Sequence, residues 1–193
     1  AGEIVAALGQ QDRLIARDAT TTYPPELTAL PDVGYMRALS PEGVLSVAPD
    51  LILAEAGAGP AEAVEVIKAT GIPYVTVPES FGPDAIAAKI RAVGEALGRP
   101  DPAARLAAEV EAGLAEARAQ AAAVTVQKRV LFVLMLQGGR VTVGGEGTAA
   151  EAIIELAGGV NAATGVAGYK AMTDEAILAA APDVILMMER EGA

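Results

Sequence analysis

Short apolar runs alternate with alanine-rich stretches along the 193 residues of the chain. The apolar runs at residues 14–16, 50–54, 74–77, 129–136 and 183–188 have the length expected of buried strands, and the stretches between them are candidate helices. Such alternation is typical of parallel sheets with helices on both faces. The hydrophobic pattern therefore predicts an α/β fold.

One helix is expected to be much longer than the others. Residues 101–123 form a run rich in alanine, glutamate, arginine and leucine, with Asp101 as its cap and Pro102 in its first turn. At about 1.5 Å per residue this helix would be roughly 35 Å long. We expect it to be a single backbone helix that joins an α/β lobe of residues 1–100 to a second, incomplete lobe of residues 124–193.

The sequences on the two sides of this helix are related. Residues 44–54, VLSVAPDLILA, match residues 177–187, ILAAAPDVILM, at six of eleven positions. Each copy predicts a helix, a Pro-Asp turn and a buried strand, and each follows a Gly-Tyr pair, Gly34-Tyr35 or Gly168-Tyr169. The match predicts two related lobes; the alternative is that this sequence is merely a common way to begin a buried strand.

The two copies are expected to differ in what flanks them. In the second lobe a strand at 129–136 precedes the helix that starts near Thr148, whereas in the first lobe the equivalent helix starts near Gly2 with nothing before it. The first copy continues through another helix and strand at 60–77, whereas the second stops at 190–193. We therefore expect a fragment that lacks parts at both ends.

Composition restricts the chemistry. The chain has no histidine and no cysteine, which excludes Ser-His-Asp triads, cysteine nucleophiles, thiolate zinc sites and imidazole ligation. Any metal must be held by oxygen, methionine sulfur or lysine. A net charge of −11 argues against binding to nucleic acid or to an anionic membrane surface. The longest apolar run, 130–136, is too short to span a bilayer, and no signal peptide is recognisable, so we expect that any export signal has been removed or never existed.

The segment at residues 33–43, VGYMRALSPEG, places a tyrosine and an arginine just ahead of a helix cap. In an extended loop, residues i and i+2 point to the same side, so Arg37 is expected to lie beside Tyr35. Gly34 would let the backbone approach a ligand closely, and Ser40-Pro41-Glu42 would cap and start the next helix.

These residues lie within a longer resemblance. Residues 20–60, TTTYPPELTALPDVGYMRALSPEGVLSVAPDLILAEAGAGP, resemble the haem-binding members of the periplasmic binding proteins that serve bacterial ABC importers of haem, siderophores and cobalamin. The similarity continues through GEGTAAEAIIELAGGVN and GYKAMTDEAILAAAPDVILMMER and so covers nearly the whole chain. The YPPE…LPDVGYMR block is specific to the haem branch. The resemblance implies two α/β lobes, one backbone helix and a ligand cleft between the lobes.

The resemblance also implies roles for the first candidate residues. Ferric haem suits an anionic phenolate, so Tyr35 is expected to be the iron ligand, and Arg37 is expected to hydrogen-bond or screen that phenolate. Arg190, at the end of the second copy's strand, matches an arginine of the opposite lobe that contacts the tyrosine or a propionate; the alternative is an ordinary exposed charge. Some relatives use a histidine in the second lobe, which this chain lacks.

The remaining candidates are less specific, and most have a structural alternative. Tyr23, before two prolines, lines the cleft or packs in a rigid turn. Tyr169 and Lys170 mirror Tyr35 and Arg37 through the duplication and are further cleft candidates. The acids Glu62 and Glu151 each lie in the first turn of a helix, where the resemblance implies docking to arginines of the inner-membrane permease and where the helix dipole alone would also favour them.

A dinucleotide-binding enzyme is the alternative from another class. Strand, Gly57-x-Gly59, helix and then Glu79 imitate the nucleotide fingerprint, but Glu62 stands where the third glycine is needed. We expect instead that amides of Gly57 and Gly59 reach a propionate at a helix start. The sequence thus predicts a monomeric, periplasmic or extracytoplasmic binding protein, not an enzyme, that captures ferric protoporphyrin IX and passes it to an ABC permease. A ferric-siderophore or cobalamin binder of the same fold is the alternative ligand class.

Overall fold

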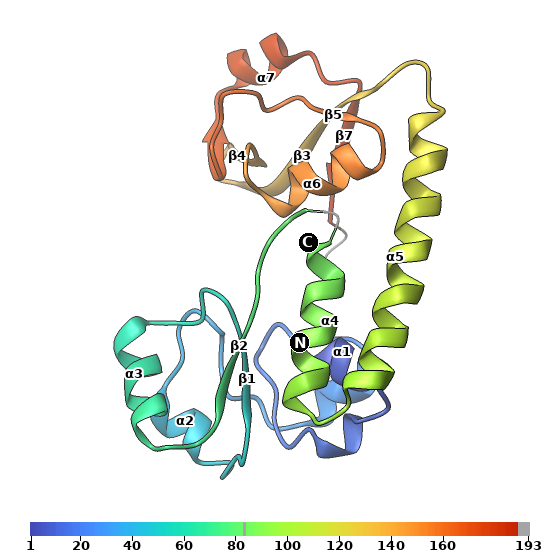
Figure 1. Ribbon diagram of the computed structural model, residues 1–193. Helices are drawn as coiled ribbons and strands as arrows, with labels where there is room; N and C mark the ends of the chain where they lie inside the picture. Colours follow the sequence, from blue (N-terminus) through green and yellow to red (C-terminus); the bar gives the residue numbers. More distant parts are fainter. Residues whose placement is uncertain (83, 189–193) are drawn as a thin grey trace. The chain divides into compact units, whose positions relative to one another are not determined.

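The computed structural model describes residues 1–82 and 84–188, which fall into two compact units. The first unit runs from Ala1 to Ser80 and from Asp84 to Glu111, and the second runs from Ala112 to the end of the described residues and includes the short segment at Phe81. Helix α5 (Pro100–Ala122) contributes its first part to one unit and its last part to the other. Each unit has its own sheet (Figure 1). The expected lobe boundaries at residues 100 and 123 stay a prediction.

The first unit is built around a parallel pair of strands. Strand β1 (Ile52–Glu55) pairs with β2 (Tyr74–Val77) from Ile52↔Tyr74 to Glu55↔Val77. Between and around them lie α1 (Gly2–Ala7), η1 (Gln11–Arg13), η2 (Pro25–Ala29), α2 (Pro41–Leu45), α3 (Ala61–Ala69) and α4 (Ala85–Ala96). Branched apolar side chains of these elements form the core, including Val5, Val77, Val93 and Leu97.

Close packing joins α4 to the start of α5. A Cβ on Gly94 would lie within 2.1 Å of the Ala103 side chain, so the two helices can approach this closely only with glycine at that position. Ala87, Ile90 and Ala107 complete a buried cluster here. Small residues at the crossing therefore decide how near the two helices lie.

The second unit holds a mixed sheet. Strand β3 (Arg129–Gln137) pairs in parallel with β5 (Val160–Asn161) and β7 (Val184–Met187) and antiparallel with β4 (Arg140–Gly144), which in turn pairs antiparallel with β6 (Tyr169–Met172). Helices α6 (Ala149–Leu156) and α7 (Asp174–Ala180) complete it. Alternate residues of β3 enter different clusters, Leu131 and Val133 on one face and Phe132 on the other, because side chains alternate across a strand.

The α/β fold class is confirmed, and four of the five expected strands are present, with bounds shifted by two residues at most. The expected strand at 14–16 is wrong, because these residues form no ladder with any described strand, and only the next residue, Arg17, makes an isolated bridge, to Asp32. The hairpin of β3 and β4 was not predicted. Its turn holds Gly138 and Gly139, both with positive φ, as a tight two-residue hairpin requires. Helix α5 begins at Pro100, so Asp101 lies in its first turn and is not its cap.

The two copies of the internal repeat fold alike. Ser40 caps α2 and Thr173 caps α7, each accepting a hydrogen bond from the backbone N–H three residues on. After each helix an alanine adopts the left-handed conformation, Ala48 at φ 48° and Ala181 at φ 43°. A Pro-Asp pair and a strand follow in both copies. Non-glycine residues adopt this conformation uncommonly, so the two copies share an unusual local backbone, and their origin by duplication stays a prediction.

Candidate functional site

Tyr35 lies on a loop that is braced by backbone pairing. The Arg17 N–H donates to the Pro31 carbonyl at 2.9 Å, and the Val33 N–H donates back to the Arg17 carbonyl at 2.9 Å. Asp32 accepts from the Gly34 N–H at 2.8 Å and pairs with the Arg17 guanidinium at 3.3 Å. Gly34 has φ +99°, a conformation that favours glycine. The chain is therefore held firmly up to the residue before Tyr35.

Tyr35 then opens a tight turn. The Ala38 N–H donates to the Tyr35 carbonyl at 2.8 Å, with Met36 and Arg37 at the centre of the turn. The expectation of an extended loop with i and i+2 on one side is therefore wrong, because this hydrogen bond reverses the chain. The Tyr35 side chain is 47% exposed and Arg37 is exposed. Within the described chain no hydrogen bond joins the Tyr35 hydroxyl to Arg37, so their pairing stays a prediction.

The loop after β1 is fastened to this turn. The Gly59 N–H donates to the Met36 carbonyl at 2.9 Å, and the Leu39 N–H donates to the Gly59 carbonyl at 2.8 Å. The structure thus brings the Tyr35 turn and the Gly57–x–Gly59 loop together at the carboxyl end of β1, the edge where α/β sheets present ligand-binding residues. The Gly59 amide is already donated and so is not free for a propionate. The Gly57 amide, at φ +84°, has no partner in the described part of the chain.

Tyr23 lies in the loop that leads to this site. Its side chain is 63% exposed, and η2 begins at Pro25, two residues later. The start of the loop is organised by Asp18, which accepts hydrogen bonds from the hydroxyls of Thr20 and Thr21. Burial raises the pKa of Asp18, but these hydrogen bonds outweigh it and hold the pKa below its ordinary value. Tyr23 and Tyr35, the two candidate tyrosines of this unit, are thus both exposed to a ligand.

The second-unit candidates lie on a strand and not on a loop. Tyr169 is the first residue of β6 and pairs with Gly144 of β4. A Cβ added to Gly144 would lie 3.2 Å from the Tyr169 ring. It is 44% exposed, and Lys170 beside it is exposed. Gly168, which precedes it, has positive φ like Gly34, so the Gly-Tyr pairs match in conformation as well as in sequence. Arg190 lies outside the described residues.

The two acids expected to dock a permease have different surroundings. Glu62 is exposed in the first turn of α3 and makes no hydrogen bond or ion pair with any described residue. Glu151 is half-buried at the start of α6, where its carboxylate accepts from the Gly147 N–H at 2.7 Å and its own N–H donates to Thr148 at 3.2 Å. This reciprocal pairing caps the helix. Glu151 therefore has a structural role that Glu62 lacks.

Two features of the site could not be found from the sequence. The Arg17–Asp32 brace joins residues far apart in the chain, and only the folded loop brings them together. The Met36–Gly59 pairing uses backbone groups alone and so leaves no residue signature. Within the described residues no group of three or more acidic side chains is arranged to hold a metal ion. No described helix is long and apolar enough to cross a membrane.

Comparison with known proteins places this geometry in a family. A family model described as periplasmic binding protein matches residues 2–193. The chain belongs to the periplasmic binding protein family. Among solved structures, this binding protein is similar to the periplasmic heme-binding protein RhuT from Roseiflexus sp. RS-1 in apo form, with 41% identity and a TM-score of 0.92 over 96% of this chain and 72% of that one.

Curated relatives are more distant. The binding protein is 28% identical over 187 residues to an uncharacterized ABC transporter substrate-binding lipoprotein, YvrC, of Bacillus subtilis, covering 95% of this chain and 59% of that protein. It is 26% identical over 190 residues to a vitamin B12-binding protein of Photorhabdus laumondii, covering 96% of this chain and 66% of that protein. The chain thus spans less than two thirds of the length of these relatives.

Proposed function

We propose that this chain is the substrate-binding component of a haem ABC importer and that Tyr35 is the residue that ligates ferric haem. The proposal rests mainly on the 41% identity to a heme-binding relative of the same fold. A tyrosine that is 47% exposed, on a turn fixed by backbone hydrogen bonds, supports it from the geometry. Because the chain lacks histidine and cysteine, a phenolate is the strongest ligand for ferric iron that it offers.

The other residues of the site assist this ligand. Arg37 lies two residues along the same turn and is proposed to screen the phenolate when it ligates iron. The Gly57 amide, one loop away and without a partner among the described residues, suits a propionate oxygen. Tyr23, Tyr169, Lys170 and Arg190 are proposed as further contacts to the porphyrin and its propionates, which apolar rings and cations suit.

The chain's work would be capture and delivery, not catalysis. Loaded with ferric protoporphyrin IX, it would act as a monomer outside the cytoplasm and pass its ligand to the inner-membrane permease. Glu62 is proposed as a docking acid, since it is exposed and unpaired among the described residues. Glu151 is proposed as a second, although helix capping already accounts for its position. A net charge of −11 does not suit binding to nucleic acid, whose phosphates repel acidic side chains.

Cobalamin or a ferric siderophore is the alternative ligand. The 26% identity to a vitamin B12-binding protein favours cobalamin within this alternative. Such a ligand brings its own metal coordination and would not need Tyr35. A direct comparison of hemin and cobalamin binding separates the two functions.

The test is a hemin titration of the full chain and of Tyr35→Phe, followed by absorption spectroscopy. Phenylalanine keeps the ring and removes the oxygen, so the tyrosinate charge-transfer bands should vanish and haem should dissociate at least about tenfold faster, equivalent to about 1.4 kcal/mol. Tyr74→Phe is the control, because Tyr74 lies within β2 and should leave the spectrum unchanged.

Three results would contradict the proposal. An unaltered spectrum in Tyr35→Phe would exclude this ligand and direct attention to Tyr23 and Tyr169. Tighter binding of cobalamin than of hemin would favour the alternative transport function. Binding of NAD(H) at the Gly57–x–Gly59 loop would favour a nucleotide-dependent enzyme.

A further inference from the structure

Two loops of the second unit are joined just ahead of β6. One is residues 145–147, between β4 and α6, and the other is residues 165–168, which lead into β6. Glu146 uses both of its backbone groups, since its N–H donates to the Val166 carbonyl at 2.6 Å and its carbonyl accepts from the Gly168 N–H at 2.8 Å. This pairing is an isolated parallel bridge and no ladder, so it joins the two loops at this point alone.

Glycine at position 145 allows the two loops to lie this close. A Cβ added to Gly145 would lie 1.9 Å from the Val166 carbonyl oxygen, far closer than real Cβ atoms approach a neighbour. The Gly145 N–H also donates to the Gly168 carbonyl at 3.0 Å. The loops are thus packed backbone against backbone, and the position of one depends on the other.

The side chain of Glu146 adds a contact that the backbone does not supply. Its carboxylate accepts from the Gly165 N–H at 2.7 Å. Gly165 is the first residue of the 165–168 loop and has φ +74°. A hydrogen bond to a carboxylate is stronger than one between two neutral groups. Glu146 therefore holds this loop at both ends, at Gly165 through its side chain and at Gly168 through its backbone.

Tyr169 follows the 165–168 loop directly and is fitted to the sheet. A Cβ added to Gly144 would lie 3.2 Å from the Tyr169 ring and equally far from the Phe132 ring, so the tyrosine lies against a position of β4 that has no side chain. The Tyr169 side chain is nevertheless 44% exposed and can contact a ligand. Its direction is set by the loop that precedes it and by the glycine that it covers.

We propose that Glu146 is a positioning residue, which holds the 165–168 loop and thereby fixes Tyr169 for contact with the porphyrin. This role rests on the proposed function, in which Tyr169 is a contact of the haem. A tyrosine that is fixed before the ligand arrives loses less freedom on binding, and such loss is one of the costs of association. Glu146 acts through Tyr169, because its own carboxylate is already bonded to Gly165.

NMR and amide hydrogen exchange of the hemin-free chain test whether Glu146 holds the loop. In Glu146→Ala the Gly165 amide loses its acceptor, so it should exchange at least about tenfold faster, and the Tyr169 ring resonances should shift. Glu146→Gln keeps an acceptor oxygen and should leave both signals close to those of the wild type. Glu155→Ala is the matched control, since it removes an exposed acid of α6 whose side chain makes no hydrogen bond or ion pair with any described residue.

Release of hemin to excess apomyoglobin tests the consequence for the ligand. Removal of a negative charge should by itself slow the release of a ligand that carries two propionates, because it lessens repulsion. Faster release therefore has the opposite sign and reports position. We expect release about threefold faster from Glu146→Ala and unaccelerated from Glu146→Gln, with no further acceleration when Glu146→Ala is added to Tyr169→Ala.

Four results would overturn the positioning role. They are unchanged Gly165 exchange in Glu146→Ala, unshifted Tyr169 resonances, equal acceleration of release with and without Tyr169, and release from Glu146→Gln as fast as from Glu146→Ala. A wild-type chain that binds no hemin would contradict the proposed function instead. The exchange and ring signals of the hemin-free chain would then still decide whether Glu146 fixes Tyr169.

Discussion

At the scale of single residues, the loop that carries Tyr23 begins at a hydrogen-bonded carboxylate. Asp18 is half-buried and accepts from the Thr20 and Thr21 hydroxyls and from the Thr20 amide. A carboxylate stabilised in this way favours its charged form. The Arg17–Asp32 pair holds the other end of the loop, ahead of Tyr35. Two neighbouring residues, Arg17 and Asp18, therefore control both ends of the segment that bears the candidate tyrosines.

The Asp18 cluster gives a prediction about pH. Its pKa is lower in the folded than in the unfolded chain, so its contribution to stability is present above the unfolded pKa and is lost as pH falls through the folded pKa. Thr21→Val removes one donor, so the Asp18 pKa should rise and the free energy of unfolding at pH 7 should fall by about 1 kcal/mol, a modest value because the carboxylate is partly exposed.

NMR titration of the Asp18 carboxyl and chemical unfolding at pH 7 and pH 3 measure both effects. Thr28→Val is the control, since that hydroxyl donates to the Pro25 carbonyl and not to a carboxylate. The loss caused by Thr21→Val should shrink at pH 3. An equal loss at both pH values would mean that the hydroxyl acts through packing.

A residue of the candidate site could be proposed from the sequence only where its side chain, and not its backbone, would contact the ligand. Tyr35 stands out because the phenol is rare in this chain and follows a glycine at φ +99°. The fastening of its turn to Gly59 uses backbone groups alone, so no residue type marks it. The turn at Met36 and Arg37 was misjudged because none of the residues that usually mark a turn stands at its centre, and its closing hydrogen bond, from the Ala38 N–H to the Tyr35 carbonyl, uses backbone groups alone.

At the scale of elements, the repeated unit is a capped helix, a left-handed alanine and a strand. Ala48 and Ala181 occupy the same place in the two copies with φ 48° and 43°. An alanine in this region pays a steric cost that glycine avoids. Both alanines are exposed, so their side chains offer little packing in return.

Replacing these alanines should therefore stabilise the protein. Ala48→Gly and Ala181→Gly should each raise the free energy of unfolding by about 0.5 kcal/mol, since relief of the left-handed strain exceeds the added freedom of the unfolded chain. Ala104→Gly, within helix α5, is the control and should destabilise by about 1 kcal/mol. Urea unfolding of the three variants measures this. Destabilisation by both repeat variants would show that the left-handed alanines carry no strain.

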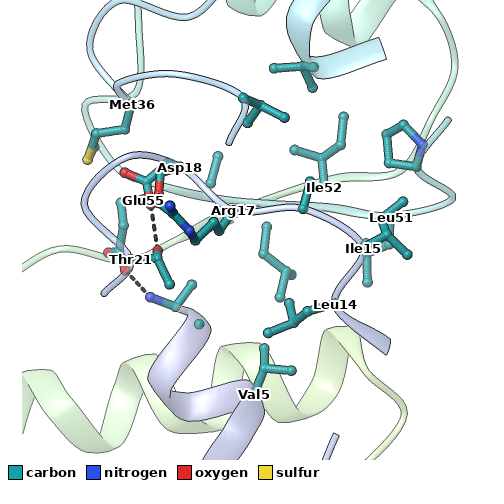
Figure 2. Close-up of a pocket in the computed structure, with 18 of the residues that line it drawn as sticks. Val5, Leu14, Ile15, Arg17, Asp18, Thr21, Met36, Leu51, Ile52 and Glu55 are labelled. Atoms are coloured by element: carbon teal, nitrogen blue, oxygen red, sulfur yellow. Dashed lines mark hydrogen bonds and ion pairs between the residues drawn. The ribbon is translucent and has the colours of Figure 1, made fainter. Parts of the chain in front are cut away.

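The elements that the sequence did not predict share a physical cause. Strands β4 and β6 are short and pair antiparallel, so their apolar positions alternate with polar ones and give no continuous run. The signal for the hairpin was the Gly138-Gly139 pair after an apolar run. The segment at 14–16 is apolar and lines a cavity beside β1 (Figure 2), but Ile15 is exposed, which shows that a short apolar run alone does not make a strand.

At the scale of the whole molecule, alternation of apolar runs and helices was enough to predict the α/β class, and the repeat was enough to predict two related units. The equivalent strands of the two copies have different neighbours in their sheets. Strand β1 pairs with β2, and strand β7 pairs with β3. Neither fact could come from composition. Pairing in a sheet depends on chain segments that are distant in sequence, and only the comparison of the two copies makes it visible.

The proposed delivery to a permease would depend on the molecule as a whole, and the two acids proposed to dock allow it to be tested separately from folding. Glu62→Lys should leave hemin binding and thermal stability unchanged but reduce transport in reconstituted vesicles, because a lysine facing permease arginines repels them by up to several kcal/mol. Glu65→Lys, on the same helix α3, is the control, and it also removes the exposed ion pair of Glu65 with Lys68. Glu151→Lys should instead lower stability by about 1 kcal/mol, since it removes a helix cap. Normal transport by Glu62→Lys would contradict the docking role, and Glu62 would then act only through its favourable interaction with the helix dipole.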